Sequence, residues 1–378
     1  MAISTVSSVP LGYDVEHLEY EYSSGQLTAW NSPLVRITTT SGLIGWGEVN
    51  GAFQRAEAVE PVLDRFRPEL LRSDPELVAE TVARLRRGHL PTRLSESVIS
   101  AIEVAVYDVL GQQREVPVYA LLGGAGGEGR CMSYGSGGLG NSIDQRVEQA
   151  VQFESTGFAT VKLRGMATTE DTLVLVERTL DTLDPDTTVA IDDTGNTGVA
   201  DVLDLVTSLN DYADRIAWFE DPAPSRQDLA AYRAIREAAS FPITGMESCV
   251  GYDEFDAALT YDCVDKIHPD VSRSGFSLTR RISTEAAARG VPVVMHVWGG
   301  IITLLANAHY AAADPNCEQI EFCRLTNPLR SAFLLEDFLQ EDSSLHLPTT
   351  GGLGIALPED IEDRYPYQPG TGHVAFDS

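Results

Sequence analysis

The chain has 378 residues, of which 43% are hydrophobic, and a formal net charge of −29. This length and apolar content predict two domains, or one large barrel with an addition, around a sizeable core. The negative charge argues against nucleic acid and anionic membranes as partners. No apolar stretch approaches the ~20 residues that span a bilayer, and the start of the chain lacks a signal-peptide pattern, so we expect a cytoplasmic protein.

The charged residues are unevenly balanced, with 56 Asp and Glu against 27 Lys and Arg, and only two of the 27 are lysines. The acidic residues are spread along the chain, which predicts a solvated acidic surface. Such a surface favours a halophilic protein that works in concentrated salt, because counterions screen the repulsion between like charges. An acidic protein of an ordinary cytosol is the alternative.

The first 125 residues predict an α+β domain. Residues 34–49 predict two strands around a turn at Ser41 and Gly42, and helical stretches follow at about 55–87 and 95–113. Ser95 is the expected N-cap of the second stretch. A glycine-rich connection closes the region, so we expect one domain over residues 1–125.

From residue 126 onward, eight short apolar or β-branched runs alternate with helical segments, and each run ends in a polar residue. The spacing is about one βα unit, so eight units predict a (β/α)8 barrel over residues 126–345. In such a barrel the carboxyl ends of the strands form the catalytic face. The expected strand ends are Tyr134, Lys162, Asp192, Glu220, Glu247, Asp270, His296 and Glu321.

Two groups of these residues predict chemistry. Asp192, Glu220 and Glu247 end three adjacent strands, where their charges would repel unless a cation held them. Carboxylate oxygens favour a hard metal ion, with Mg²⁺ the leading choice and Mn²⁺ the next. Asp270 and His296 end the next two strands, and a carboxylate beside an imidazole is typical of a general base.

The ordered motifs of the chain resemble the enolase superfamily, and within it the mandelate racemase-like branch. They are "VRITTTSGLIGWGEV", "SAIEVAVYDVLGQQREVPVYALLGG", "IDD", "FEDP", "GMES", "HPDVSRSG", "VMHVWGG" and "GGLGIALPED". The resemblance implies that the N-terminal domain caps the barrel mouth and that residues 346–378 return to this cap. It also implies dimers or octamers as the assembly.

The same resemblance implies the site. It places Mg²⁺ on the three strand-end carboxylates and implies removal of the proton α to a carboxylate, with an enediolate stabilised on the metal. It makes Asp270 and His296 the catalytic dyad. It gives Glu321 the role of hydrogen-bond donor or electrostatic partner at the substrate carboxylate.

Two positions depart from the family pattern. The family commonly has Asn two residues after the first metal ligand, where this chain has Thr194, so the surroundings of the metal can differ. Relatives that use both faces of the substrate commonly have Lys-x-Lys on the second strand, and here Arg164 follows Lys162. A guanidinium stays protonated, so Arg164 is a poor base but a good clamp for a carboxylate or hydroxyl.

Period-two alternation puts Lys162 and Arg164 on one face of their strand, toward the barrel mouth. Three carboxylates and Mg²⁺ sum to −1, and these two cations bring the sum to +1, so a monoanionic substrate makes the pocket neutral. We therefore expect a small anionic substrate. Lys162 would lie beside its carboxylate and help to neutralise the enediolate.

One convincing base, His296, suits elimination, so the leading hypothesis is an acid-sugar dehydratase (a hydro-lyase) that yields a 2-keto-3-deoxy acid. An epimerase or racemase would need a second base, which Arg164 makes difficult. A cycloisomerase or dipeptide epimerase usually has lysines ending the second and sixth strands. A non-catalytic, metal-dependent binder of sugar acids would not need a general base.

Other residues are candidates for substrate contact or for proton transfer. The cap segments that would select the substrate include Trp30, Asn50 and Phe53. The donor of a proton to the leaving hydroxyl is open between His296 itself and Tyr134. Lys266 either lines the barrel or lies at the surface, and the particular acid sugar stays undetermined.

The first testable prediction concerns salt. Lowering KCl from about 1 M to about 0.1 M lengthens the Debye length from ~3 to ~10 Å, which strengthens repulsion within a chain of charge −29. We expect the melting temperature, measured by circular dichroism, to fall as the salt is removed. An unchanged melting curve would contradict salt adaptation.

Overall fold

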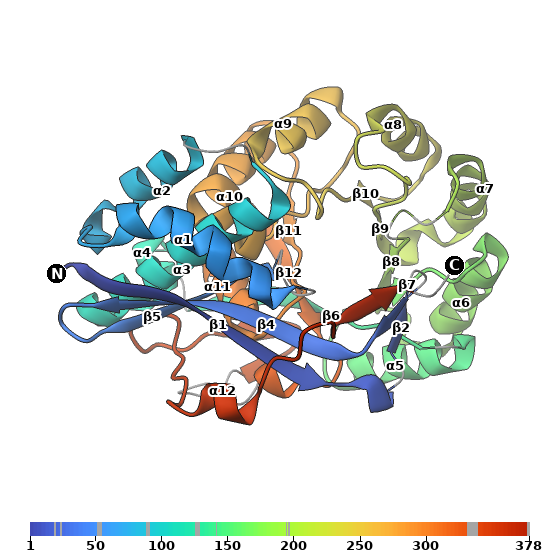
Figure 1. The fold of residues 1–378 in the computed structure, drawn as a ribbon. Helices are drawn as coiled ribbons and strands as arrows, with labels where there is room; N and C mark the ends of the chain where they lie inside the picture. Colours follow the sequence, from blue (N-terminus) through green and yellow to red (C-terminus); the bar gives the residue numbers. More distant parts are fainter. Residues whose placement is uncertain are drawn as a thin grey trace.

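A computed structural model describes residues 1–18, 20–22, 25–50, 55–87, 91–124, 129–140, 142–193, 195, 197–330 and 339–375. Two of the residues discussed above, Phe53 and Thr194, lie outside this described part. An N-terminal region with an antiparallel sheet, which we call the cap, lies against a parallel barrel (Figure 1). Among the described residues, no helix combines the length and apolar character needed to cross a bilayer.

The cap is built on a three-stranded antiparallel sheet in the order β1-β4-β5. The predicted pair of strands is confirmed as β4 and β5, and β1 is a third strand that the sequence pattern did not indicate. The cap elements are β1 (Ile3–Asp14), β2 (Tyr20–Tyr22), β3 (Gly25–Leu27), β4 (Ala29–Thr39), β5 (Ile44–Glu48), α1 (Val59–Leu70), α2 (Val78–Arg87), α3 (Arg93–Arg114) and α4 (Val118–Leu121).

Two details of the helix prediction were wrong. The stretch predicted at 55–87 divides into α1 and α2, because a short 3₁₀ turn that begins at Pro75 separates them. Ser95 is not the N-cap of α3. Thr92 is the N-cap, and the Ser95 side chain bonds back to the Thr92 backbone in a reciprocal capping box.

Two glycines bring β5 unusually close to α3. A Cβ added at Gly45 would lie 2.0 Å from the Ala105 carbonyl oxygen, and one at Gly47 would lie 1.9 Å from that of Ala101. Gly45 and Gly47 lie on the same face of β5, and Ala105 and Ala101 lie about one turn apart on α3, so the two contacts repeat along both elements. Only glycine fits at both positions of the strand. This packing fixes the end of β5, from which the chain enters the barrel mouth.

The second half of the chain forms a parallel sheet with the strand order β10-β9-β8-β7-β6-β12-β11 and helices on its outside (Figure 1). The elements are β6 (Arg130–Ser136), α5 (Ile143–Ser155), β7 (Thr160–Arg164), α6 (Thr169–Thr182), β8 (Thr188–Asp192), α7 (Val199–Leu209), β9 (Ile216–Glu220), α8 (Leu229–Ala238), β10 (Ile243–Thr244), α9 (Tyr252–Tyr261), α10 (Val271–Ala288), β11 (Val293–Met295), α11 (Ile301–Ala313) and β12 (Cys317–Cys323).

The expected sixth strand is reduced to a short extended segment that still closes the barrel. On one side His268 N donates to Gly245 O at 2.9 Å, and on the other Val294 N donates to Ile267 O at 3.0 Å. Ile267 also forms a parallel bridge with Val293. The segment therefore joins β10 to β11 and completes the (β/α)8 barrel.

Several expected strand ends were displaced by a few residues. Tyr134, Lys162 and Glu321 each lie two residues before the end of their strands, and Glu247 lies three residues beyond β10. Asp270 is the N-cap of α10, because its side chain accepts from Ser272 N. The polar residues still gather at one end of the barrel, because each of these shifts is short.

A small apolar cluster fills the barrel below this end and sets the direction of the polar residues. It consists of Tyr134, Ala190, Trp218 and Val294, all at most 1% exposed. Asp192, Glu220 and His296 each follow a member of this cluster by two residues. Because side chains alternate along an extended chain, these polar groups point into the same interior, one layer closer to the mouth.

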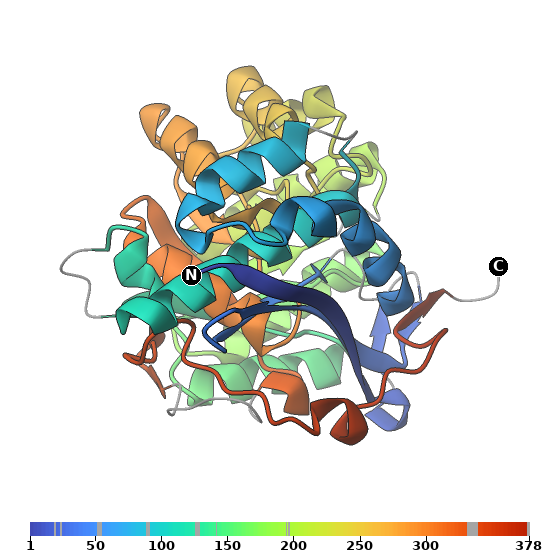
Figure 2. The same cartoon turned by 60° about the vertical axis from the view of Figure 1, so that its left-hand side comes forward.

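The C-terminal segment from residue 339 onward contains β13 (Leu339–Glu341), β14 (Ser344–His346), α12 (Ile361–Arg364) and β15 (His373–Ala375). β14 pairs antiparallel with β6 of the barrel, whereas β15 pairs antiparallel with β3 of the cap. Figure 2 shows this segment, in red, running along the cap to its far side.

Candidate active site

Three carboxylates lie at the carboxyl ends of neighbouring strands. Asp192 ends β8 and pairs in register with Glu220, which ends β9. Glu247 follows β10 after Met246, whose backbone has the left-handed φ of 77°. The side chains of Asp192 and Glu220 are at most 1% exposed, and that of Glu247 is 19% exposed. Such a group of buried acids needs a compensating positive charge.

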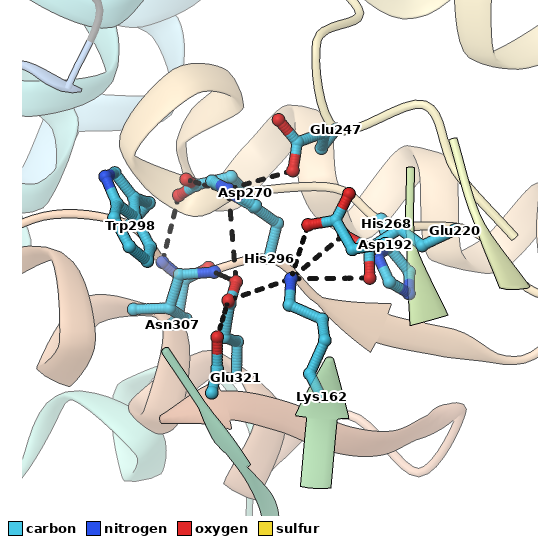
Figure 3. A network of polar contacts seen from close by, with 12 residues as sticks. Lys162, Asp192, Glu220, Glu247, His268, Asp270, His296, Trp298, Asn307 and Glu321 are labelled. Carbon is cyan, nitrogen blue, oxygen red and sulfur yellow. Dashed lines mark hydrogen bonds and ion pairs between the residues drawn. The ribbon is translucent and has the colours of Figure 1, made fainter. Parts of the chain in front are cut away.

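Lys162 supplies a positive charge at this point. Its Nζ lies 3.1 Å from Glu220 Oε1, 3.4 Å from Asp192 Oδ2 and 2.9 Å from Glu321 Oε1. Figure 3 shows the ammonium pointing among these three carboxylates from β7. The Lys162 side chain is 1% exposed, so the ion cluster is shielded from water.

The members of the cluster have pKa values that are shifted in different directions. Burial, together with the negative charge of Glu220, raises the pKa of Asp192 to about 6. Burial would also raise the pKa of Glu220, but Lys162 and then His268 hold it well below its usual range. Burial alone would lower the pKa of Lys162, yet Glu220 and Glu321 raise it well above its usual value. Lys162 is therefore a fixed cation.

The chemistry of the donor set fits a hard divalent cation. Asp192, Glu220 and Glu247 offer only carboxylate oxygens, and the raised pKa of Asp192 reflects burial first and then the negative charges of Glu220 and Glu247, which a cation would offset. As the side chains lie, the described part of the chain has no three acidic, histidine or cysteine groups close enough to hold a metal ion. Lys162 lies between Asp192 and Glu220, while Glu247 Oε2 lies 3.1 Å from His296 Nε2.

The structure brings the predicted dyad together. His296 Nδ1 lies 2.9 Å from Asp270 Oδ2, and Asn50 Nδ2 donates to the same oxygen at 3.4 Å. The other oxygen accepts from Ser272 N, Ser272 Oγ and Asn307 Nδ2 at 2.8, 2.6 and 3.0 Å. Burial opposes ionisation, but the hydrogen bond and charge of His296 lower the pKa of Asp270 to about 2. An ionised Asp270 fixes the Nδ1–H tautomer, so Nε2 is the ring nitrogen that faces the cluster, where it lies 3.1 Å from Glu247 Oε2.

Glu321 is an acceptor in this arrangement. Its carboxylate accepts from Ser136 Oγ and from Val297 N, and it also pairs with Lys162. Burial would raise the pKa of Glu321, but Lys162 and His296 lower it to about 2. In these contacts Glu321 accepts and does not donate, and its role at a substrate carboxylate stays a prediction.

Arg164 lies on β7, across the barrel from the segment that leads to Asp270. Its Nη1 lies 3.0 Å from Asp192 Oδ2, its Nε donates to Gly137 O at 3.2 Å, and its guanidinium carbon lies 4.8 Å from the centre of the Trp298 ring. The prediction that Lys162 and Arg164 share a face is confirmed, because both reach Asp192. Arg164 is therefore held in place as a cation.

The remaining candidates lie in different surroundings. Trp30 is 5% exposed, packs 5.2 Å from the Trp298 ring and donates to Thr326 O, so it lies behind Trp298. Tyr134 is fully buried, with its ring 5.9 Å from Lys162 Nζ, and burial raises the pKa of its phenol well above 10, which argues against it as a proton donor. Phe53 lies outside the described residues.

Lys266 both lines the barrel and reaches its surface, the two alternatives that the sequence left open. Its Nζ lies 5.4 Å from the Trp218 ring inside the barrel and 2.7 Å from Glu318 Oε2 near the start of β12. It therefore lies at the end of the barrel away from the site.

Sequence reasoning missed several residues that hold the site together. Ser272, Arg273 and Trp298 stand within three residues of Asp270 or His296, so proximity in sequence could have indicated them. Arg273 Nη1 donates to Glu247 O and lies 3.8 Å from its carboxylate. Asn307 lies within α11, eleven residues after His296, and no local pattern points to it.

Two family descriptions match most of the chain. The description "Enolase C-terminal domain-like" matches residues 145–361, and "Mandelate racemase / muconate lactonizing enzyme, N-terminal domain" matches residues 21–123. The chain belongs to the enolase superfamily. Within it, this superfamily member falls in the mandelate racemase and muconate lactonizing enzyme group.

The individual relatives share between 25 and 28% of their residues with this chain. D-galactarolactone cycloisomerase from Agrobacterium fabrum is 28% identical, over 86% of this chain and 89% of its own. Arabinonate dehydratase from Saccharolobus solfataricus is 26% identical, over 87% and 89%. The crystal structure of the 3,6-anhydro-D-galactonate cycloisomerase from Zobellia galactanivorans superposes with a TM-score of 0.86 at 25% identity, over 97% and 99%.

The two lysines of this enolase superfamily member permit a matched test of the ion cluster. Lys162→Met keeps most of the side-chain volume but leaves three buried carboxylates without their ammonium. We expect the metal-free protein to lose about 3 to 5 kcal/mol of unfolding free energy, the usual result of removing one partner of a buried ion pair. Denaturant titration followed by circular dichroism measures this loss.

Lys266→Met is the control, because Glu318 is 46% exposed and the pair is partly solvated. It should cost less than about 1 kcal/mol. Equal losses in the two variants would show that the cluster around Lys162 has no special dependence on its charge.

Proposed function

We propose that the chain is an acid-sugar dehydratase, which removes the proton α to a carboxylate and eliminates the β-hydroxyl as water. The observation that carries this proposal is the asymmetry of the site. On one side His296 is paired with Asp270 at 2.9 Å as a base, and on the other Arg164 is tied to Asp192 and stacked on Trp298. A site with one base suits elimination better than inversion at the α-carbon.

The chain's own residues divide the work as follows. His296 Nε2 accepts the α-proton while Asp270 holds the ring and stabilises the imidazolium. The electron pair of the C–H bond moves into the substrate carboxylate, where Lys162 and Arg164 stabilise the added negative charge. The pair then forms the α,β double bond as the β C–O bond breaks. The leaving hydroxide takes a proton and departs as water, and the enol product tautomerises to a 2-keto-3-deoxy acid.

His296 can supply that proton when the two groups leave from the same face of the substrate. Once it has accepted the α-proton, its imidazolium is the acid nearest the reacting carbon in the dyad. The same proton then leaves with the hydroxyl, so the ring returns to its neutral form for the next cycle.

We further propose that Asp192, Glu220 and Glu247 hold the metal, Mg²⁺ or else Mn²⁺. A divalent cation there would act as a Lewis acid that offsets negative charge on the substrate carboxylate. The all-oxygen donor set and the repulsion between these acids support this assignment.

The arabinonate dehydratase relative supports a sugar acid as substrate. Asn50, Trp30 and Phe53 are the cap residues that we propose as contacts or supports for its far end. Asn50 Oδ1 is buried without a partner among the described residues, so it can accept from a substrate hydroxyl. We also propose a cytoplasmic, salt-adapted homo-oligomer, with residues 1–125 and 346–378 as the cap domain and 126–345 as the barrel domain.

The two cycloisomerase relatives support a second candidate with the same first step. If the β-oxygen belongs to a lactone or anhydro ring, the same elimination opens the ring and no water is released. The product then has the mass of the substrate, so mass spectrometry separates cycloisomerisation from dehydration. Epimerisation would need a second base opposite His296.

Metal removal tests the ligand assignment. EDTA should abolish activity and Mg²⁺ should restore it, because the proposed cation would supply the Lewis acid that offsets negative charge on the substrate carboxylate. Glu220→Gln should bind Mg²⁺ at least about tenfold more weakly in a calorimetric titration. Glu237→Gln, at a side chain that is 65% exposed on α8, is the control and should bind normally. A metal-free preparation with full activity would contradict the assignment.

Isotope exchange tests the single base. A substrate analogue without the β-hydroxyl should exchange its α-hydrogen in D₂O with retention of configuration, because the proton leaves and returns on the His296 face. Proton NMR follows both exchange and configuration. His296→Asn should lose exchange by several orders of magnitude, whereas His17→Asn, at an exposed position of the cap, should exchange normally. An inverted product that persists in His296→Asn would reveal a base on the Arg164 side and favour an epimerase.

A further inference from the structure

One group that touches the dyad comes from the cap. Asn50 lies two residues beyond the end of β5 and is 3% exposed. Its Nδ2 donates to Trp298 O at 2.6 Å and to Asp270 Oδ2 at 3.4 Å. Asp270 follows the sixth barrel segment and Trp298 lies two residues after His296, so one amide links the two sides of the dyad.

The orientation of this amide follows from its surroundings. A backbone carbonyl and an ionised carboxylate can only accept hydrogen bonds, so the amide must present its NH₂ group to both. Its oxygen then points away from them and has no partner among the described residues. Both hydrogen bonds of the Asn50 NH₂ group therefore go to Asp270 and to the Trp298 carbonyl, whatever group the amide oxygen contacts.

A second cap residue holds the same loop. Glu48, at the end of β5, accepts from Gly300 N at 2.7 Å and from Thr303 N at 2.9 Å. Ser32 Oγ donates to Glu48 at 2.8 Å, which fixes the carboxylate within the cap sheet. Residues 298 to 303 are therefore bonded to the cap at both ends, immediately after the histidine.

The barrel holds only one oxygen of Asp270 firmly. Oδ1 accepts three hydrogen bonds from Ser272 and Asn307, whereas Oδ2, which bonds His296, has Asn50 as its other hydrogen-bond donor among the described residues. Oδ2 also lies 3.7 Å from Arg273 Nε, beyond hydrogen-bond distance. Loss of Asn50 would therefore remove the cap's hydrogen bonds to Oδ2 and to the Trp298 carbonyl, on the two segments that carry the dyad.

We propose that Asn50 is a positioning residue of the base, through which the docked cap aligns Asp270 and His296 for proton abstraction. This inference rests on the proposed function for its kinetic consequences but not for its structural one. The two ends of the Asn50 amide have different roles in this proposal. The NH₂ group affects the rate of proton removal, and the oxygen is available to accept a hydrogen bond from the substrate.

The kinetic test compares three variants. Asn50→Ala removes both ends of the amide, whereas Asn50→Asp keeps an acceptor and loses the donor. We expect kcat to fall about 10- to 100-fold in both, the usual cost of losing a group that orients a functional residue. KM should change less than about threefold in Asn50→Asp. Asn31→Ala is the control, because Asn31 is also a buried cap amide but donates to Thr371 O, away from the dyad.

A double-mutant cycle tests whether Asn50 acts through Asp270. In the Asp270→Asn background, adding Asn50→Ala should lower kcat less than about twofold, because the oxygen to be positioned is already gone. If Asn50 acted only on the substrate, the two losses would multiply. Multiplicative losses, or an Asn50→Asp enzyme with the kcat of the parent, would overturn the proposal.

A spectroscopic readout separates this proposal from the proposed reaction. The downfield proton of His296 Nδ1–H, assigned by its loss in His296→Asn, should shift or broaden in Asn50→Ala and stay unchanged in Asn31→Ala. An unchanged resonance in Asn50→Ala would overturn the positioning role. If the parent protein turns over no sugar acid, the proposed function fails, and the resonance still decides the role of Asn50.

Discussion

The site depends on one ammonium group among buried acids. Lys162 Nζ lies within 3.4 Å of carboxylate oxygens from Asp192, Glu220 and Glu321, and all four side chains are almost completely shielded from water. Removing several charges from water costs several kcal/mol for each ion, so these groups are stable only when their geometry keeps them together. The barrel provides this geometry, because parallel strands bring residues far apart in sequence to one rim.

The apolar layer beneath the ion cluster makes the charges effective. Tyr134, Ala190, Trp218 and Val294 fill the barrel and keep water from reaching the carboxylates from below. A low local dielectric strengthens every interaction above this layer, including those with a substrate anion. The strongly negative chain thus presents fixed positive groups, Lys162 and Arg164, where its proposed anionic substrate would bind.

The cap is part of this arrangement as well as a cover for it. Gly45 and Gly47 press β5 onto α3, and the strand then delivers its next residues to the loop after His296. Elsewhere Arg86 of α2 donates to Ser274 O, just beyond the residues that hold Asp270 and Glu247. The N-terminal ends of α10 and α11, which flank the dyad, are therefore both bonded to the cap.

The sequence predicted the barrel, the cap strands β4 and β5 and the gathering of the polar rim, because periodicity and strand-end chemistry are local signals. It identified the partners His296 and Asp270 from their spacing alone. It misplaced the N-cap of α3, since Thr92 and Ser95 are both good caps and only the backbone path decides between them. It did not indicate Asn307 or the contact of Asn50 with Asp270, because these depend on how α11 and the cap pack in three dimensions.

The scarcity of lysine has a practical consequence for studying motion in this protein. The chain has two side-chain amines, of which Lys162 is enclosed at the barrel mouth and Lys266 is paired at the opposite end. A reagent that acylates amines would meet a surface almost without targets, since arginine carries the remaining positive charge. The rate at which it modifies Lys162 would then report how often the cap opens and the ion cluster separates, without any engineered label.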